Sequence, residues 1–467
     1  MKQKILLTLM LLTAAFGASA SNFKVDGIYY DTNENEATVS FNLSYPGDLV
    51  IPETITYDGV TYTVTAIRSY AFRDCQDLTS VTIPKTILTI GDDAFFNCQA
   101  LISVTIDDAP TTIGDQAFAR CYQLKNVSLG HNVTSIGWSA FADCFDLMDV
   151  VIPNTVTSIG NTAFAHCVSM TSVGIPSSVT YIGERPFYSC SNLNSITVDS
   201  DNPNYDSRDY CDALIETSSN TLITGCMNTI IPNSVTSIRD NAFYACNYSG
   251  SLTIPNSVTT IGDKAFYHCD LTEVTIGNSV TTIGDQAFYQ CSDLTKVTIG
   301  NSVTSIGDEA FFGCYDLTSI EIPRSVTTIG SRAFYGCDWL RDKVICRATT
   351  PPTCTGGFDT FSDEGTYEYA ILYVPKRSIT AYESADGWKE FERIISISHL
   401  PDEPEEPEPG DIDGDGVLNV NDVTGLIDML LAGTANIEDY PAADVNWDGS
   451  IDIGDVTELI DLLLSNQ

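Results

Sequence analysis

Apolar residues recur along most of this chain in a phrase of about 23 residues. One copy runs from Leu294 to Cys314 and reads LTKVTIGNSVTSIGDEAFFGC. Each copy carries a phenylalanine followed three residues later by a cysteine, and neighbouring phenylalanines lie 23 residues apart, with one interval of 22 and one of 56. A fixed period of this length indicates a solenoid, whose units bury their apolar faces against their neighbours. The phenylalanines are Phe72, Phe95, Phe118, Phe141, Phe164, Phe187, Phe243, Phe266, Phe288, Phe311 and Phe334.

Each unit contains two strand-like stretches. Val81 and Ile83 alternate with Thr82, which is the period of a strand with one buried face. A second alternation, at residues 280–283, predicts a shorter strand, and Gly284 then permits a tight bend.

A column of small polar residues follows this glycine. Side chains of this kind accept hydrogen bonds from the free amides at a helix start, so we predict that they cap a short helical turn in each unit. Recurrence in nearly every unit favours capping over a carboxylate site, although Trp138 and Glu184 interrupt the column. Its members are Ser69, Asp92, Asp115, Asn161, Asp240, Asp263, Asp285, Asp308 and Ser331.

These units resemble the BspA-like leucine-rich repeat family in its short form LxxVxIPxSVxxIGxxAFxxC, over roughly residues 65–340. The resemblance implies an α/β solenoid with parallel β-sheet and short helical turns. It also implies display outside a bacterial cell, often for adhesion, by binding a protein or glycan ligand.

The segments around the repeats predict a secreted, multidomain chain. Lys2, Lys4 and the apolar run 5–16 are typical of a signal peptide, and no later run is long enough to span a membrane. The long interval predicts a hairpin of residues 213–216 and 221–224, which is either functional or simple family variation. The predicted divisions are a signal peptide at 1–20, an N-terminal β cap of hairpins at 21–64, repeats at 65–340 with an elaborated coil at about 197–230, a C-terminal cap at 341–398, an acidic proline-rich linker at 399–410 and a terminal domain at 411–467.

The terminal domain contains two calcium-loop patterns 33 residues apart. Oxygen donors recur with the spacing of a twelve-residue loop that has glycine at its sixth position, and hard cations need several such donors at once. The first loop offers Asp411, Asp413, Asp415, the backbone carbonyl of Val417, Asn419 and Asp422. The second offers Asp444, Asn446, Asp448, Ser450, Asp452 and Asp455.

Each loop leads into a predicted helix with an apolar stripe. The stripes are Val423, Leu426, Ile427, Leu430 and Leu431, and then Val456, Leu459, Ile460, Leu463 and Leu464. This duplicated pattern resembles a type I dockerin, a small all-α domain, and the resemblance implies two calcium ions and a cohesin-type protein partner.

Two features of the terminal domain depart from the dockerin pattern. Val420-Asn421 and Ile453-Gly454 stand where partner-reading Ser/Thr pairs are usual, and Asp428 and Asp461 stand where basic residues are frequent. The identity of the partner is therefore open, and so is the alternative of a calcium-stabilised terminus that docks nothing.

Charge excludes some classes of partner. The formal net charge is −40, and residues 399–467 contain 18 acidic and no Lys or Arg residues. Such a surface repels phosphate backbones and anionic membranes, which argues against nucleic-acid binding.

Eleven of the fifteen cysteines occupy the same slot in each repeat, so we predict a column of buried thiols. Cys211 with Cys226, and Cys346 with Cys354, are each left open as disulfide or free thiols.

No catalytic pattern emerges. His166 and His268 precede repeat cysteines, but other units hold unrelated residues in that slot. The sequence therefore predicts a non-enzymatic adhesion or recognition protein, secreted or at the bacterial cell surface. The alternative is a non-catalytic subunit of a cohesin–dockerin assembly for polysaccharide degradation.

Overall fold

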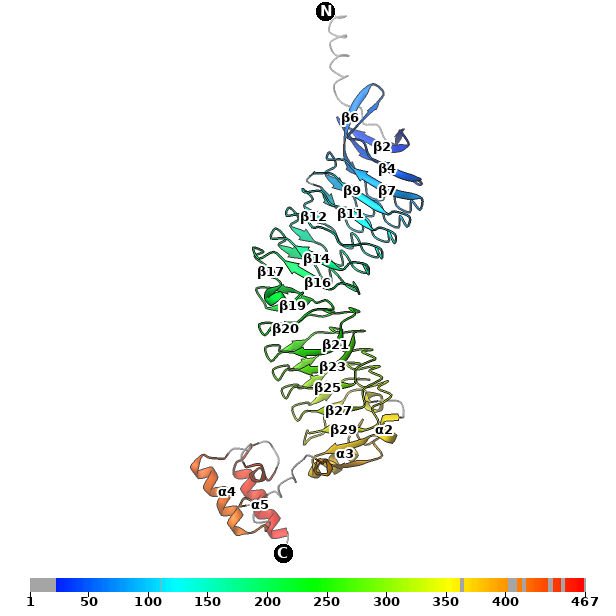
Figure 1. Ribbon diagram of the computed structural model, residues 1–467. Helices are drawn as coiled ribbons and strands as arrows, with labels where there is room; N and C mark the ends of the chain where they lie inside the picture. Colours follow the sequence, from blue (N-terminus) through cyan, green and yellow to red (C-terminus); the bar gives the residue numbers. More distant parts are fainter. Residues whose placement is uncertain are drawn as a thin grey trace, which may run out of the picture.

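The repeats form a solenoid of parallel strands, as predicted, in which coils stack in sequence order (Figure 1). The signal peptide predicted at 1–20, most of the predicted linker, Asp415 and Asp448 lie outside the described residues. The computed structural model describes residues 22–109, 111–361, 365–401, 410–413, 417–435, 440–446 and 450–465.

Most coils contribute one strand to the face formed by the longer strands. The predicted alternation is present, because Val81 and Ile83 of β7 are buried while Thr82 is partly exposed. These strands pair in parallel and in register, as Val81 does with Val104. They are β4 (Gly47–Val50), β7 (Leu78–Ile83), β9 (Ser103–Ile106), β11 (Asn126–Ser128), β14 (Ser172–Ile175), β16 (Ser195–Val198), β21 (Ser249–Ile254), β23 (Asp270–Ile276), β25 (Lys296–Thr298), β27 (Ser319–Ile322), β29 (Lys343–Cys346), β31 (Ile371–Val374) and β32 (Ile394–Ser396).

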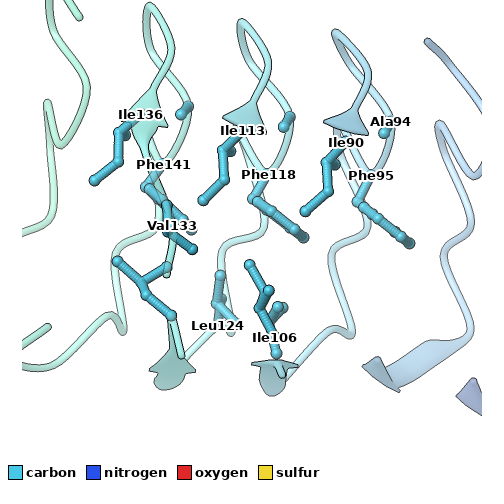
Figure 2. Packing of buried hydrophobic residues seen from close by; sticks show 14 of the residues in the cluster. Ile90, Ala94, Phe95, Ile106, Ile113, Phe118, Leu124, Val133, Ile136 and Phe141 are labelled. Carbon is cyan, nitrogen blue, oxygen red and sulfur yellow. The ribbon is translucent and has the colours of Figure 1, made fainter. Parts of the chain in front are cut away.

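The second predicted strand is a two-residue strand that ends in a buried apolar residue, usually isoleucine. Its parallel pairing brings Ile90, Ile113 and Ile136 into one column (Figure 2). These strands are β8 (Thr89–Ile90), β10 (Thr112–Ile113), β12 (Ser135–Ile136), β13 (Ser158–Ile159), β15 (Tyr181–Ile182), β20 (Ser237–Ile238), β22 (Thr260–Ile261), β24 (Thr282–Ile283), β26 (Ser305–Ile306), β28 (Thr328–Ile329) and β30 (Thr353–Cys354).

Antiparallel hairpins cover the N-terminal end of the stack, as the turn residues predict. A solenoid end exposes an apolar layer, and Tyr30, Tyr62 and Val64 of these strands are buried against it. The strands are β1 (Phe23–Val25), β2 (Ile28–Asn33), β3 (Glu36–Val39), β5 (Thr54–Tyr57) and β6 (Val60–Ile67).

The repeat phenylalanines form two columns of stacked rings inside the solenoid, one from Phe72 to Phe187 and one from Phe243 to Phe334, and part of the first is shown in Figure 2. The ring centroids of Phe95 and Phe118 are 5.1 Å apart, and those of Phe118 and Phe141 are 5.3 Å apart. Because each ring packs between the coils above and below, a single coil cannot bury it.

The prediction that the polar column caps helices within its own coil is wrong. Asp92 Oδ1 accepts a hydrogen bond from the backbone N–H of Asp115 in the next coil at 2.8 Å, and Asp115 Oδ1 does the same for Trp138 at 2.7 Å. The column is therefore a ladder of hydrogen bonds between neighbouring coils, and Trp138 takes part in it through its backbone N–H. The segment that follows is a series of turns closed between residues three apart, in which left-handed residues such as Tyr70 and Asp74 prevent a helix from continuing.

A glycine precedes most residues of the polar column and is required by the close approach of neighbouring coils. A side chain at Gly114 would place its first carbon 2.8 Å from the backbone nitrogen of Asp92 and 2.6 Å from its carboxylate oxygen. This contact explains the glycine before seven of the nine polar residues, while Arg68 and Arg239 precede Ser69 and Asp240.

All fifteen cysteines are free and buried, so the predicted thiol column is present and neither open pair is bridged. Each repeat thiol from Cys98 to Cys190 donates to the carbonyl of a repeat phenylalanine in the preceding coil, as Cys98 Sγ does to Phe72 O at 3.1 Å. Burial raises the pKa of Cys190 from its ordinary 9.0 to about 12, and does the same to the pKa of Cys291.

We expect the repeats to lose stability as the pH rises from about 9 towards 12. An unfolded thiol ionises near 9.0, whereas the folded Cys190 keeps its proton until about 12, so the unfolded state releases protons first. One such thiol lowers the free energy of unfolding by up to about 1.4 kcal/mol per pH unit in this window. Urea unfolding midpoints between pH 8 and 11 measure this dependence. In the variant Cys190→Ala, the free energy of unfolding should fall less steeply with pH, by the contribution of one proton. An identical slope would contradict the prediction.

The elaborated coil separates the solenoid into two blocks. The predicted hairpin is present as β18 (Leu214–Glu216) and β19 (Thr221–Thr224), with β17 (Tyr205–Asp206) and the 3-10 turn η2 (Arg208–Tyr210) before it. It divides both strand faces, and Gly225 leaves room for the Phe243 ring, which would otherwise lie 1.9 Å from a side chain. On the turn side the blocks still touch, because the Tyr188 and Tyr244 rings stack at 4.2 Å.

A mixed segment covers the C-terminal end of the stack. Phe361 extends the phenylalanine column, with its ring centroid 5.4 Å from that of Phe334. Trp388, Phe391 and Tyr382 are buried around it. Its elements besides β31 and β32 are η3 (Gly357–Thr360), α2 (Gly365–Tyr369), η4 (Lys376–Ser378), α3 (Ile379–Ser384) and η5 (Ile397–His399).

The terminal domain has two helices of equal length, α4 (Val420–Ala432) and α5 (Ile453–Ser465), with the 3-10 turn η6 (Pro441–Ala443) between them. None of the helices that the structure describes is long and apolar enough to cross a membrane.

Candidate functional site: the acidic loops and the exposed faces

The first acidic loop brings together three of its predicted ligands. Asp411, Asp413 and Asp422 each offer a carboxylate oxygen, and the three oxygens lie within 4.8 Å of one another. Asp422 is completely buried, and its Oδ1 and Oδ2 accept from the backbone N–H groups of Ile412 and Asn419, each at 2.8 Å. The same carboxylate therefore closes the loop and caps α4.

Two other predicted ligands of this loop contact each other. The Asn419 side-chain amide donates to the carbonyl oxygen of Val417 at 2.8 Å, while its own oxygen accepts from Asn421 N at 2.8 Å. Asp415, at the fifth loop position, lies outside the described residues.

The second loop repeats the capping arrangement. Asp455 is fully buried, with Oδ1 accepting from Asn446 N at 3.1 Å and Oδ2 from Asp452 N at 2.7 Å. Asp444 is also buried, at 3% exposure, whereas Ser450 is exposed. Asp448 lies outside the described residues, and among those described, only the first loop brings three acidic groups within ligating distance.

The donor set fits a calcium ion better than it fits a transition metal. All the candidate donors are oxygen atoms, from carboxylates, an amide, a hydroxyl and a backbone carbonyl, which hard cations prefer. Buried carboxylates such as Asp422, Asp444 and Asp455 are costly unless a cation or hydrogen bonds compensate them. A bound ion would supply the positive charge that this lysine- and arginine-free domain lacks.

The predicted helix stripes are only half buried. Leu426 of α4 and Leu459 of α5 form the core of the domain together with Ala443, Val445 and Val456. Val423, Leu430 and Leu463 are partly buried, whereas Ile427, Leu431, Ile460 and Leu464 are exposed, which the sequence pattern alone does not reveal.

The exposed apolar residues occur as equivalent pairs, one on each helix. Val420 and Ile453, at loop position ten, are both 72% exposed. Leu431 and Leu464, near the end of each helix, are 82% and 65% exposed. Ile427 and Ile460, in the middle of each helix, are also exposed. Each helix thus presents three apolar residues to solvent at equivalent positions.

The solenoid displays a polar strand face and an aromatic turn face. Outward strand residues such as Ser80, Thr82 and Thr105 are small. On the turn face, aromatic rings stack from coil to coil and are half-buried, so packing between coils accounts for them. This column consists of Tyr188, Tyr244, Tyr267, Tyr289, Phe312 and Tyr335.

The repeat Cys and His residues do not form a nucleophilic pair. Cys167 and Cys269 donate into the core, to the carbonyls of Phe141 and Phe243, and burial raises the pKa of both thiols well above the ordinary value. His268 is exposed on the surface instead. A buried thiol that keeps its proton is a poor nucleophile.

Two family models match the chain. A model described as the BspA type leucine-rich repeat region matches in six copies, over residues 54–169, 134–224 and 223–341. A model of the type I dockerin domain matches residues 409–464. Dockerin domains bind calcium and have cohesin-type protein partners, and both families are typical of bacterial extracellular or surface proteins. No curated protein matches the chain.

Several solved structures share the fold. A leucine-rich cell surface protein from Faecalibacterium prausnitzii is 27% identical, with a TM-score of 0.52, and the match covers 81% of this chain and 96% of that one. A leucine-rich repeat protein from Bacteroides ovatus is 29% identical, with a TM-score of 0.54 and coverage of 80% and 99%. The pneumococcal vaccine antigen PcpA is 20% identical, with a TM-score of 0.57 and coverage of 81% and 99%, and shows the shared fold alone.

Proposed function

This chain belongs to the BspA-type leucine-rich repeat family and carries a type I dockerin domain, and we propose on that basis that it is a secreted or cell-surface binding protein without catalytic activity. In this proposal the solenoid recognises a protein or glycan ligand, and the dockerin domain attaches the chain to a cohesin-type protein when two calcium ions are bound. The domain divisions predicted from the sequence are part of the same proposal.

The observation that carries the docking function is the exposed apolar triad on each helix of the dockerin domain. Val420, Ile427 and Leu431 on α4 have equivalents 33 residues later on α5, and none of the six is buried. Exposed apolar side chains that recur on both halves of a duplicated domain favour a role in partner contact. They support a partner whose docking face is apolar, in place of the Ser/Thr-reading face expected for other dockerins.

Changing both triads should abolish docking. The double variant Val420→Asp, Ile453→Asp places charges at two apolar contact positions, and we expect affinity for type I cohesin modules of the same genome to fall at least about hundredfold. Surface plasmon resonance with the full chain in calcium measures this loss. The double variant Val420→Ile, Ile453→Val, which keeps both positions apolar, is the control and should retain affinity. Binding that survives the aspartates, or that is the same with a chelator, would refute the docking proposal.

A second candidate function follows from the dockerin domain itself. Cohesin–dockerin pairs assemble polysaccharide-degrading complexes, so the chain would be their non-catalytic, ligand-recognising subunit. The other proteins attached to its cohesin partner distinguish the two candidates: glycoside hydrolases favour the assembly, and other surface proteins favour adhesion.

A further inference from the structure

The outward strand face changes character in the second block of the solenoid. Across the first block it carries mainly small polar residues, but at β25, β27 and β29 a hollow of about 400 Å³ is lined by two lysines. Lys296 lies at one side of this hollow and Lys343 at the other, with Ser319 between them. Ser319 and Lys343 are register partners, and Lys296 occupies the same repeat position one coil earlier.

Lys296 and Lys343 give this hollow an excess of positive charge. Neither forms an ion pair within the part of the chain that the structure describes, although Glu273 is the register partner of Lys296. The one carboxylate in the hollow, Glu321, is paired with Arg347. Adjacent strands lie about 4.8 Å apart, so the two lysine backbones are roughly 10 Å apart, and both side chains are long enough to converge over Ser319. An anion seated there would relieve their mutual repulsion.

The remaining lining is suited to hydroxyl groups and to the C–H face of a sugar. Thr298 adds a hydroxyl group to the lining, and Asn278 and Asn301 add side-chain amides. Asn278 Oδ1 accepts from Asn301 N at 3.1 Å, which leaves its amide hydrogens for a ligand. Ile299 and Ile345 form an apolar floor.

We propose that this hollow binds a saccharide that carries one carboxylate, with the carboxylate between Lys296 and Lys343. A single acidic sugar residue fits better than a dense polyanion, because a chain of net charge −40 repels extended negative charge. The proposal rests on the proposed ligand-binding function of the solenoid, and it names the chemical class of that ligand.

Calorimetric titration of the full chain with 3′-sialyllactose, methyl glucuronide and lactose tests the site, because each of the two acidic saccharides carries a single carboxylate. We expect at least one acidic saccharide to bind and lactose not to bind, and the identity of the binder tells whether a sialic acid or a uronic acid is the source. Lys296→Gln and Lys343→Gln should each weaken binding at least tenfold. Lys85→Gln is the matched control, because Lys85 is exposed and paired with Glu53 at 3.2 Å in the first block.

The outcomes separate this proposal from the general one. Failure of both acidic saccharides to bind, or binding that the Lys296 and Lys343 variants leave unchanged, overturns the proposed site. If neither acidic saccharide binds but the chain still binds mucin, whether intact or deglycosylated, the solenoid has another ligand. In that case only the proposal of the acidic-saccharide site fails. If it binds no mucin or bacterial-surface preparation either, the proposed recognition function fails as well.

Discussion

Replacing Phe266 with alanine is expected to lower the free energy of unfolding of the solenoid by about 3–5 kcal/mol. The Phe266 ring is fully buried and stacks between Phe243 at 4.8 Å and Phe288 at 5.2 Å. Truncation removes the contacts of this ring with both neighbouring coils and leaves a cavity at the interface that joins them. In a solenoid, stability depends on these nearest-neighbour interfaces, so the loss is not shared with distant coils.

Guanidinium unfolding of the full chain in calcium, followed by far-UV circular dichroism, measures this effect. Phe145→Ala is the control, because Phe145 is 40% exposed and stacks with Tyr122 alone at 5.0 Å. An aromatic pair of this kind contributes about 0.5–1.5 kcal/mol beyond area burial, so its loss should be several times smaller. Equal shifts of the two midpoints would show that the column is not the main source of cohesion.

Removing calcium is expected to unfold α4 and α5 while the solenoid remains folded. The dockerin domain has a small core, centred on Leu426 and Leu459, and it buries three carboxylates that metal binding would compensate. A ligand present at a thousand times its dissociation constant stabilises the folded state by about 4 kcal/mol, which is comparable to the whole stability of so small a domain. The solenoid has its own extensive core and does not share this dependence.

Thermal unfolding with calcium and with EGTA should therefore show a helical transition that only the chelator removes. Asp413→Asn, which changes an exposed carboxylate of the first loop, should lower calcium affinity about tenfold or more. The matched variant Asp428→Asn removes the same charge from the exposed face of α4 and should leave the affinity unchanged. A helical signal that is indifferent to EGTA would mean that these loops do not hold the domain together.

Much of the solenoid was predictable because its pattern repeats. Alternation at Val81 and Ile83, and one phenylalanine and one cysteine per unit, specify two strands, a ring column and a thiol column that can be buried only by stacking. The acidic group of the first loop, Asp411, Asp413 and Asp422, was also predictable, since donor spacing within twelve residues is a local property of the chain.

Only the tertiary structure decided the roles that depend on a partner far along the chain. Asp92 reads as a helix cap in isolation, but the amide it accepts from is that of Asp115 in the next coil. Ile427 and Leu431 read as core because their spacing is helical, yet helical spacing cannot tell how wide a stripe a two-helix domain has room to bury. Lys296 and Lys343 stand 47 residues apart in the sequence and meet only because parallel coils in register place equivalent positions side by side. Within the solenoid, the sequence by itself determined which residues face inward, because the pattern repeats in every unit, and the stacking of the coils determined which of the outward ones act together.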